Sequence, residues 1–161
     1  MITRQLDKNL AGEDMKAFSF KLLNEPLFVP DSIRAYAPLL KTLKRIVEEP
    51  LSVLMGAYND ADELRGVFGV INIVPETDAR FVLWTWGKPA LTHRLVRDCR
   101  DLITYVKATY GLRRVTAQAA SEKQSQVLQL IGFKVEGRFR SGYKHKGQFQ
   151  NLFQLRIIGE L

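Results

Sequence analysis

The sequence predicts an α+β (α/β) fold. In this fold a mixed, mostly antiparallel central sheet is flanked by helices. Three apolar runs follow one another between residues 51 and 86 with only short polar loops between them, which is typical of an antiparallel meander. A long amphipathic helix then separates the third run from a fourth strand, and such a crossover favours parallel pairing of those two strands. Because no repeat or long linker interrupts these elements, we expect one domain over residues 1–161.

The first third of the chain is expected to supply one strand and two helices. Residues Ile2–Leu6 can form a strand, and Glu13–Leu23 carries apolar residues at helical spacing. A second helix is predicted to begin at Asp31, a favourable N-cap residue, and to reach Val47. Pro38 within it predicts a kink or a later start.

The meander is predicted from Leu51–Tyr58, Leu64–Val74 and Arg80–Trp86. The five residues Asn59–Glu63 form a polar hairpin loop between the first two strands. Residues 75–78 join the second strand to the third.

The second half of the chain begins with the long helix, which follows Pro89 and ends at Gly111, a residue suited to a left-handed C-cap. A buried strand and a short helix stopped by Gly132 come next. A closing hairpin follows. The predicted bounds of these elements are Arg114–Ala119, Lys123–Ile131, Lys134–Phe139 and Phe149–Ile158.

Composition excludes several classes of protein. At 161 residues and 46% hydrophobic content the chain can bury a proper core, and no apolar run approaches the roughly 20 residues that span a bilayer. No secretion signal is recognisable, so we expect a cytoplasmic protein. The only cysteine, Cys99, lies in the apolar stripe of the long helix and is interpreted as a core thiol. Because His93 and His145 are far apart, no metal site is predicted.

The net charge of +7 is concentrated in the second half of the chain. Nine basic and two acidic residues lie between Arg113 and Arg156, an excess equal to that of the whole protein. This favours an anionic partner such as a nucleotide phosphate, a nucleic acid or an acidic protein surface. A solvated basic face is the alternative.

Five short motifs accompany this order of elements. They are Gly87-Lys88, Gly111–Ala117, Ile131-Gly132-Phe133, Glu136–Arg140 and Lys146–Asn151. In this order and at these distances, they resemble the GNAT superfamily of CoA-dependent acyltransferases. The second half is most similar to the branch that includes ribosomal-protein N-terminal acetyltransferases.

The resemblance implies acetyl-CoA as cofactor, with its pyrophosphate on the backbone N–H groups of a loop and helix start. The cofactor-binding positions it implies are Leu83, Trp84, Gly87, Lys88, Ala90, Thr92 and Ser121. The family's loop motif is altered here, because Trp86, Pro89 and Leu91 occupy its three defining positions. Proline has no N–H to donate. Lys88 and Thr92 can compensate, or the segment is simply a tight strand-to-helix turn.

The resemblance also implies positions for proton transfer, and these are substituted. Ser121 and Leu128 stand where many members have an asparagine and a tyrosine that serves as general acid. Ser121 is interpreted either as a ligand of the pantetheine arm or as a helix cap. Tyr143 and Tyr105 are candidates to replace the missing acid.

The carboxylates Glu76 and Asp78 are the candidate bases, provided that their loop reaches a crevice between the third and fourth strands.

The leading functional prediction is transfer of an acetyl or other acyl group from CoA to an amine on a small molecule or protein. A second hypothesis is a catalytically inactive member of the same fold that serves as a binding or assembly module, including a viral structural one. A third is nucleic-acid binding by the basic C-terminal hairpin, through Arg138, Arg140, Lys144 and Lys146.

Overall fold

The computed structural model describes residues 2–9, 11–24, 41, 44–46, 48–85, 93–119, 121–145 and 148–158. For residues 21–24, 141–145 and 149–150 it describes the backbone only. The predicted helix Asp31–Val47 lies mostly outside the described residues, as do Trp86 and the loop that follows it.

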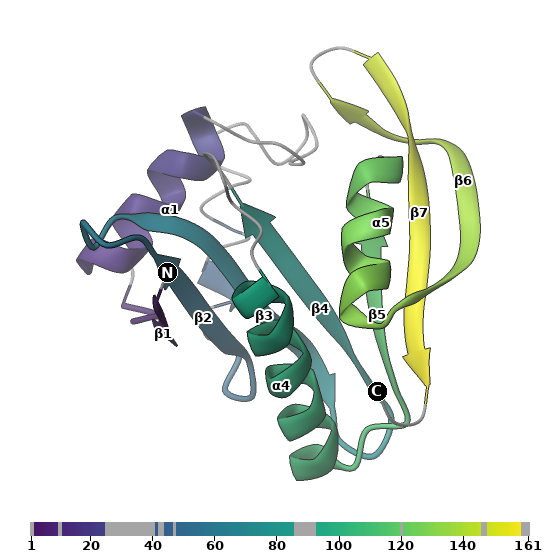
Figure 1. Ribbon diagram of the computed structural model, residues 1–161, viewed down its shortest axis with the longest axis horizontal. Helices are drawn as coiled ribbons and strands as arrows, with labels where there is room; N and C mark the ends of the chain where they lie inside the picture. Colours follow the sequence, from purple (N-terminus) through teal and green to yellow (C-terminus); the bar gives the residue numbers. More distant parts are fainter. Residues whose placement is uncertain are drawn as a thin grey trace.

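The described chain is organised around one seven-stranded sheet with the order β1-β2-β3-β4-β5-β7-β6 (Figure 1). The strands are β1 Ile2–Gln5, β2 Val53–Tyr58, β3 Leu64–Val74, β4 Asp78–Thr85, β5 Arg114–Ala119, β6 Lys134–His145 and β7 Gln148–Ile158. All neighbours pair antiparallel except β4 and β5, which pair in parallel. The predicted mixed, mostly antiparallel sheet is therefore confirmed.

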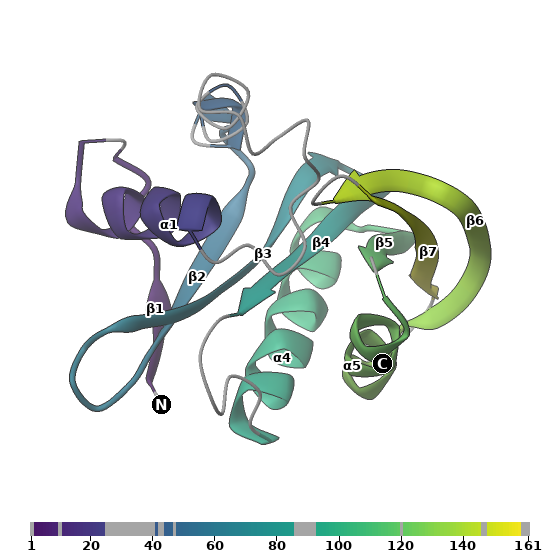
Figure 2. The same cartoon turned by 90° about the horizontal axis from the view of Figure 1, so that it is seen from above.

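Helices cover both faces of the sheet. The described helices are α1 Glu13–Asn24, α4 His93–Tyr110 and α5 Glu122–Ile131. Figure 2 shows α1 on one face and α4 with α5 on the other. The apolar stripe of α4 that faces the sheet consists of Leu95, Cys99, Ile103 and Val106, at the spacing of an amphipathic helix.

Alternation along the strands divides the core into two clusters. On the face of α4 and α5, Phe81 of β4 packs with Val115, Ala117 and Ala119 of β5. On the face of α1, Val82 of β4 packs with Met15, Phe18 and the strand residues around them. Because successive strand residues point to opposite faces, β4 contributes to both clusters.

The two glycines that were predicted to end helices in the second half of the chain do so. Gly111 follows α4 with a φ of +63°, and the N–H of Leu112 donates to the carbonyl of Lys107. Gly132 follows α5 with a φ of +124°, and its N–H donates to the carbonyls of Leu128 and Gln129. Glycine adopts these left-handed conformations without a Cβ penalty, so each helix ends there.

Several predicted strand bounds differ from the structure, among them the start of β4 and the end of β6. β4 begins at Asp78, two residues before the predicted start, because the pairing of Asp78 with Val74 and Arg114 continues the sheet there. β6 continues past Phe139 to His145, with register shifts at Val135/Gly137 and Phe139/Tyr143. Such β-bulges interrupt the alternation of side chains, which hides the continuation of the strand from a pattern-based prediction.

Candidate functional site

The feature of the sheet most suited to a ligand is the divergence of β4 from β5. Their parallel register covers only three pairs, from Asp78↔Arg114 to Arg80↔Thr116, although both strands continue. On its other side β4 stays paired with β3 up to Thr85. We call this arrangement the fork; it comprises residues 80–85 of β4 and 116–119 of β5 (Figure 1).

Over residues 81–85, the edge of β4 that faces β5 has no partner strand among the described residues. Backbone N–H and C=O groups on such an edge need partners, and an extended ligand with amide groups can supply them. The crossover that produces the fork was predicted from the long helix between two strands. A ligand crevice is common where strands separate at such a crossover.

The two described cofactor candidates on β4 lie in this segment. Leu83 is half-buried against the core on the α4 and α5 face, whereas Trp84 is half-buried on the opposite face. The Trp84 ring packs against Phe18 of α1, with 5.3 Å between ring centroids. Trp84 can therefore serve a ligand in the fork through its backbone, while its indole fills the core beside α1.

Ser121 caps helix α5. Its hydroxyl oxygen accepts a hydrogen bond from the N–H of Gln124 at 3.2 Å, and its backbone is extended, with φ −153° and ψ 162°. This is the geometry of an N-cap, the second of the two roles that the sequence left open. The hydroxyl proton is not used by this bond, so a role for Ser121 toward a cofactor stays a prediction.

The remaining cofactor candidates, Gly87, Lys88, Ala90 and Thr92, lie outside the described residues. So do Pro89 and Leu91, whose effect on the loop motif therefore also stays a prediction. The chain is described again from His93, the first residue of α4.

Neither the position of the family's tyrosine, Leu128, nor the candidate acid Tyr105 is suited to proton transfer. Leu128 is 5% exposed and belongs to the core cluster beneath α5, so the position of the family's tyrosine is filled by packing. Tyr105 is 64% exposed and points away from the sheet, because it lies two residues after the buried Ile103 on α4. Tyr143 pairs with Gln150 on β6 and β7, and its side chain is not described.

The candidate bases Glu76 and Asp78 lie outside the fork, at or before the first residue of β4. Asp78 is in the first β4–β5 pair, and its carboxylate accepts hydrogen bonds from the Arg114 guanidinium at 3.1 and 3.3 Å. The N–H of Glu76 donates to the carbonyl of Tyr110 at the end of α4. Both residues therefore lie where β4 and β5 are closed, and the loop does not reach the fork, which was the condition set for a catalytic role.

The base of the fork carries polar residues that the sequence analysis did not single out. A terminal nitrogen of Arg80 donates to Oε1 of Gln118 at 2.9 Å, across the separating strands. Nε2 of Gln118 lies 3.3 Å from Oε1 of Gln154 on β7. The sequence does show Arg80 as a charged residue at the start of an apolar run. The partners of Arg80 could not be predicted, because they depend on which strands become neighbours.

Cys99 is fully buried in the core cluster, as predicted. Burial, and secondarily the charge of Asp98, raises the pKa of its thiol well above the ordinary value. A thiol in this state is a poor nucleophile. Cys99 is therefore a packing residue.

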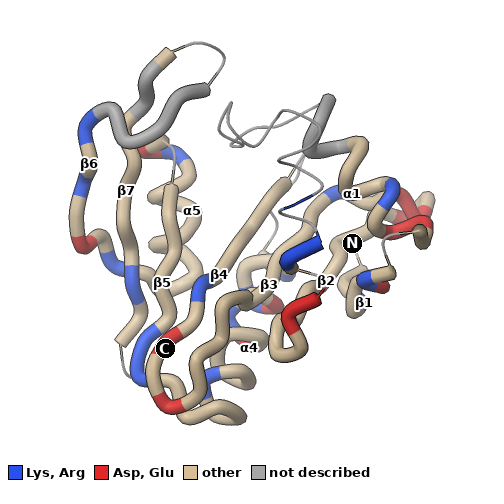
Figure 3. Tube along the Cα trace, turned by 180° about the vertical axis from the view of Figure 1, so that it is seen from behind, with Lys and Arg blue, Asp and Glu red and all other residues tan. Residues whose placement is uncertain are grey.

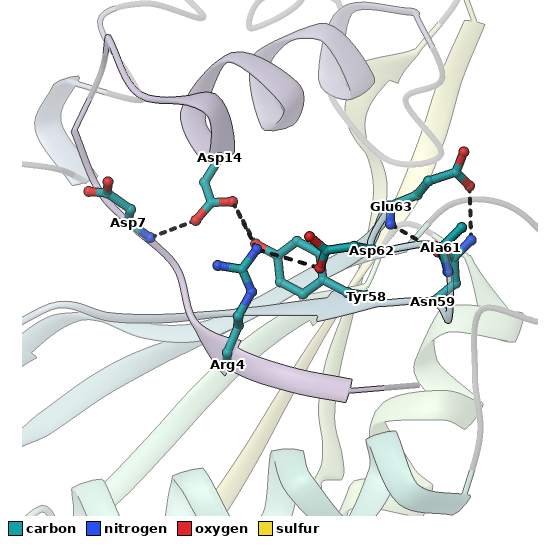
Figure 4. A network of polar contacts seen from close by, with 8 residues as sticks. All are labelled: Arg4, Asp7, Asp14, Tyr58, Asn59, Ala61, Asp62 and Glu63. Carbon is teal, nitrogen blue, oxygen red and sulfur yellow. Dashed lines mark hydrogen bonds and ion pairs between the residues drawn. The ribbon is translucent and has the colours of Figure 1, made fainter.

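A hollow of about 460 Å³ lies between β1, the start of α1 and the β2–β3 hairpin. Figure 4 shows that its polar residues bind one another. The Arg4 guanidinium lies 4.0 Å above the Tyr58 ring, 3.7 Å from Asp14 and 3.9 Å from Asp62, and the Tyr58 hydroxyl donates to Asp14 at 2.7 Å. We interpret these contacts as structural, because they hold the N-terminal strand and helix against the sheet.

The basic excess of the second half is spread along β5, β6 and β7 (Figure 3). Part of it is neutralised, since Arg114 pairs with Asp78 and Arg156 with Glu136 at 3.1 Å. Arg138 lies over the Phe153 ring. No helix within the described residues is long and apolar enough to cross a membrane.

Sequence comparison finds no matching family model and no matching curated protein. Solved structures do match. A mutant of spermidine N-acetyltransferase from Vibrio cholerae superposes with a TM-score of 0.70 at 14% identity, over 98% of this chain and 95% of that one. The same enzyme in complex with CoA and spermine has a TM-score of 0.69 at 15% identity, over 98% and 94%.

A structure described as a probable acetyltransferase has a TM-score of 0.68 at 24% identity, over 97% of this chain and 91% of that one. At identities this low, the matches establish the architecture alone. The placement of this chain in the ribosomal-protein branch stays a prediction. The chain thus has the GNAT fold over nearly its whole length, in common with a spermidine N-acetyltransferase and a probable acetyltransferase.

Proposed function

We propose that this protein is an acyltransferase that moves an acetyl or other acyl group from CoA to an amine of a small molecule or a protein. The observation that carries the proposal is the fork, where β4 leaves β5 after Arg80 in a fold shared with N-acetyltransferases. One of those structures contains CoA and an amine, spermine. Cytoplasmic location accompanies this proposal as an expectation.

The fork suits the extended, amide-bearing arm of acetyl-CoA. The free edge of β4 can bind that arm as it would bind an added strand. The α4 helix begins beyond the end of β4, and helix starts bind phosphate through free N–H groups. The residues proposed to hold the cofactor are Leu83, Trp84, Gly87, Lys88, Ala90, Thr92 and Ser121.

Acetyl-CoA supplies an acyl group activated as a thioester. In the proposed reaction the acceptor nitrogen forms a bond to the acyl carbon, the carbon–sulfur bond breaks, and the amine gives up a proton while the thiolate gains one. Tyr143 and Ser121 remain the proposed candidates for proton transfer. Leu128 cannot take part in proton transfer, because its side chain has no ionisable group.

The proposal is tested by titrating the protein with acetyl-CoA. At about 100 times the Kd, the free energy of unfolding should rise by about 2.7 kcal/mol, with binding heat in calorimetry. Lys88→Glu should weaken binding because it reverses a charge near the proposed pyrophosphate site, whereas Lys16→Glu on α1 serves as the control. Absence of both the stabilisation and the heat would exclude the proposal.

A binding module without catalysis is the second candidate function. The burial of Leu128 favours it, because the usual position of the general acid has become part of the core. A stable protein complex that forms equally with and without acetyl-CoA, from a protein that turns over no amine, supports this candidate. Release of CoA thiol in the presence of any amine refutes it.

A further inference from the structure

Arg80 is a half-buried cation without a carboxylate partner among the described residues. Its Nε is shut off from solvent and has no hydrogen-bond partner. Among the described residues, its terminal nitrogen donates to the neutral amide of Gln118 and to no other side chain. The nearest acid on the same strand, Asp78, is engaged by Arg114.

This arrangement is costly for the folded protein. A buried guanidinium normally has an anionic partner, because desolvation is otherwise uncompensated. Burial lowers the pKa of Arg80, and the positive charge of Arg45 lowers it further. Arg156, on the same face of the sheet, has the usual solution, an ion pair with Glu136. Packing alone does not explain why Arg80 occupies this position of β4 without a carboxylate partner among the described residues.

The position of Arg80 separates it from the proposed pyrophosphate site. Arg80 is the last β4 residue in register with β5, and Thr85 ends the strand five residues later, about 16 Å away. Its side chain is on the face of Val82 and α1, opposite the face covered by α4 and α5. Arg80 thus lies at the base of the fork and faces the side away from those two helices.

We propose that Arg80 binds an oxyanion of the acceptor, so that the acceptor is an amine that also carries a carboxylate or a phosphate group. This inference rests on the proposed acyltransferase function and names its substrate class. The terminal N–H groups that Gln118 does not use can donate charge-assisted hydrogen bonds to such an oxyanion. A polycation such as a polyamine is disfavoured, because Arg80 and Arg45 repel it.

The test compares amines that differ in the anionic group alone: aminohexanoate with hexylamine, and phosphoethanolamine with ethanolamine, with spermidine as the polycation. Release of CoA thiol gives kcat/KM for each. The wild type should prefer the anionic member of each pair by about 10-fold or more, the worth of one hydrogen bond to a charged group.

Arg80→Gln should abolish this preference and leave the Kd for acetyl-CoA unchanged. Arg80→Lys should retain part of it because the charge remains. Arg156→Gln should retain all of it because that arginine has its own partner. Equal use of anionic, neutral and polycationic amines by the wild type would overturn the inference while leaving acyl transfer intact. So would an Arg80→Gln protein that folds and keeps the preference.

A separate readout applies if acetyl-CoA does not bind and no amine is acetylated, which is the failure of the proposed function. Thermal unfolding is then measured with inorganic phosphate at constant ionic strength. Stabilisation of the wild type and of Arg156→Gln, but not of Arg80→Gln, supports an anion site at Arg80. Equal effects on all three proteins exclude it.

Discussion

Replacement of Gly69 by alanine tests whether the packing of β2 on β3 is as close as the structure shows. Gly69 lies opposite Leu54 in the β2–β3 register, and β3 holds β4, one wall of the fork. A Cβ at Gly69 would lie 2.3 Å from the carbonyl oxygen of Val53 and 2.6 Å from a methyl carbon of Leu54. Cβ contacts under 3.0 Å are essentially never seen, so the two strands must separate by about 0.7 Å.

The obstacle is backbone, and the neighbouring Leu54 side chain is 1% exposed in the core, so neither can turn away. Overpacking of this kind costs about 1–3 kcal/mol, and we expect Gly69→Ala to lie near the upper end of that range. Urea unfolding followed by circular dichroism measures the loss as a lower midpoint at constant slope.

Two other glycines provide matched controls. Gly137 has nothing within 4 Å of a built Cβ, so Gly137→Ala should change the free energy of unfolding little. Gly66 meets the Trp84 carbonyl at 3.2 Å, and Gly66→Ala should fall between the two. A Gly69→Ala protein within about 0.5 kcal/mol of Gly137→Ala would refute the close approach of β2 and β3.

Three further predictions follow from single contacts. Ser121→Ala should cost about 1 kcal/mol in urea unfolding and Ser121→Asp much less, because aspartate also caps; equal losses would remove the capping role. Burial, then the hydrogen bond to Asp14, raises the pKa of Tyr58 above its ordinary 10.0, so its contribution to stability is complete below pH 10 and declines as the pH rises further. Tyr58→Phe should therefore make stability less dependent on pH above 10, and an unchanged alkaline profile would contradict this. Cys99 should react with iodoacetamide at pH 8 only after unfolding, because burial keeps its thiol protonated; rapid labelling of the native protein would show that the site is open.

Periodicity and stop residues were enough to predict most elements. Gly111 and Gly132 end α4 and α5 where their conformational freedom is needed, and the bounds of β5 are exact. The polar loop Asn59–Glu63 was likewise predicted, and the Asn59 side chain closes it by accepting from the N–H groups of Ala61 and Glu63. These features depend on near neighbours in the sequence, which is why a single sequence was sufficient.

The candidate site was predicted less completely. The resemblance indicated Ser121 and the β4 segment, but their orientation depends on what packs beside them. Trp84 faces Phe18, a residue far away in the sequence, so its indole belongs to the core. Leu128 could be recognised from the sequence as unable to donate a proton, and the structure adds that its position is buried.

By itself the sequence determined the class of fold, the order of its elements and the parallel crossover between β4 and β5. The tertiary structure decided the rest, because β7 lies between β5 and β6 and brings Gln154 beside Gln118. That choice also decides which side chains border the base of the fork, where Arg80 is half-buried and its Nε–H has no partner among the described residues. Which strand of the closing hairpin lies beside β5 depends on register and packing between distant segments, and local patterns do not specify it.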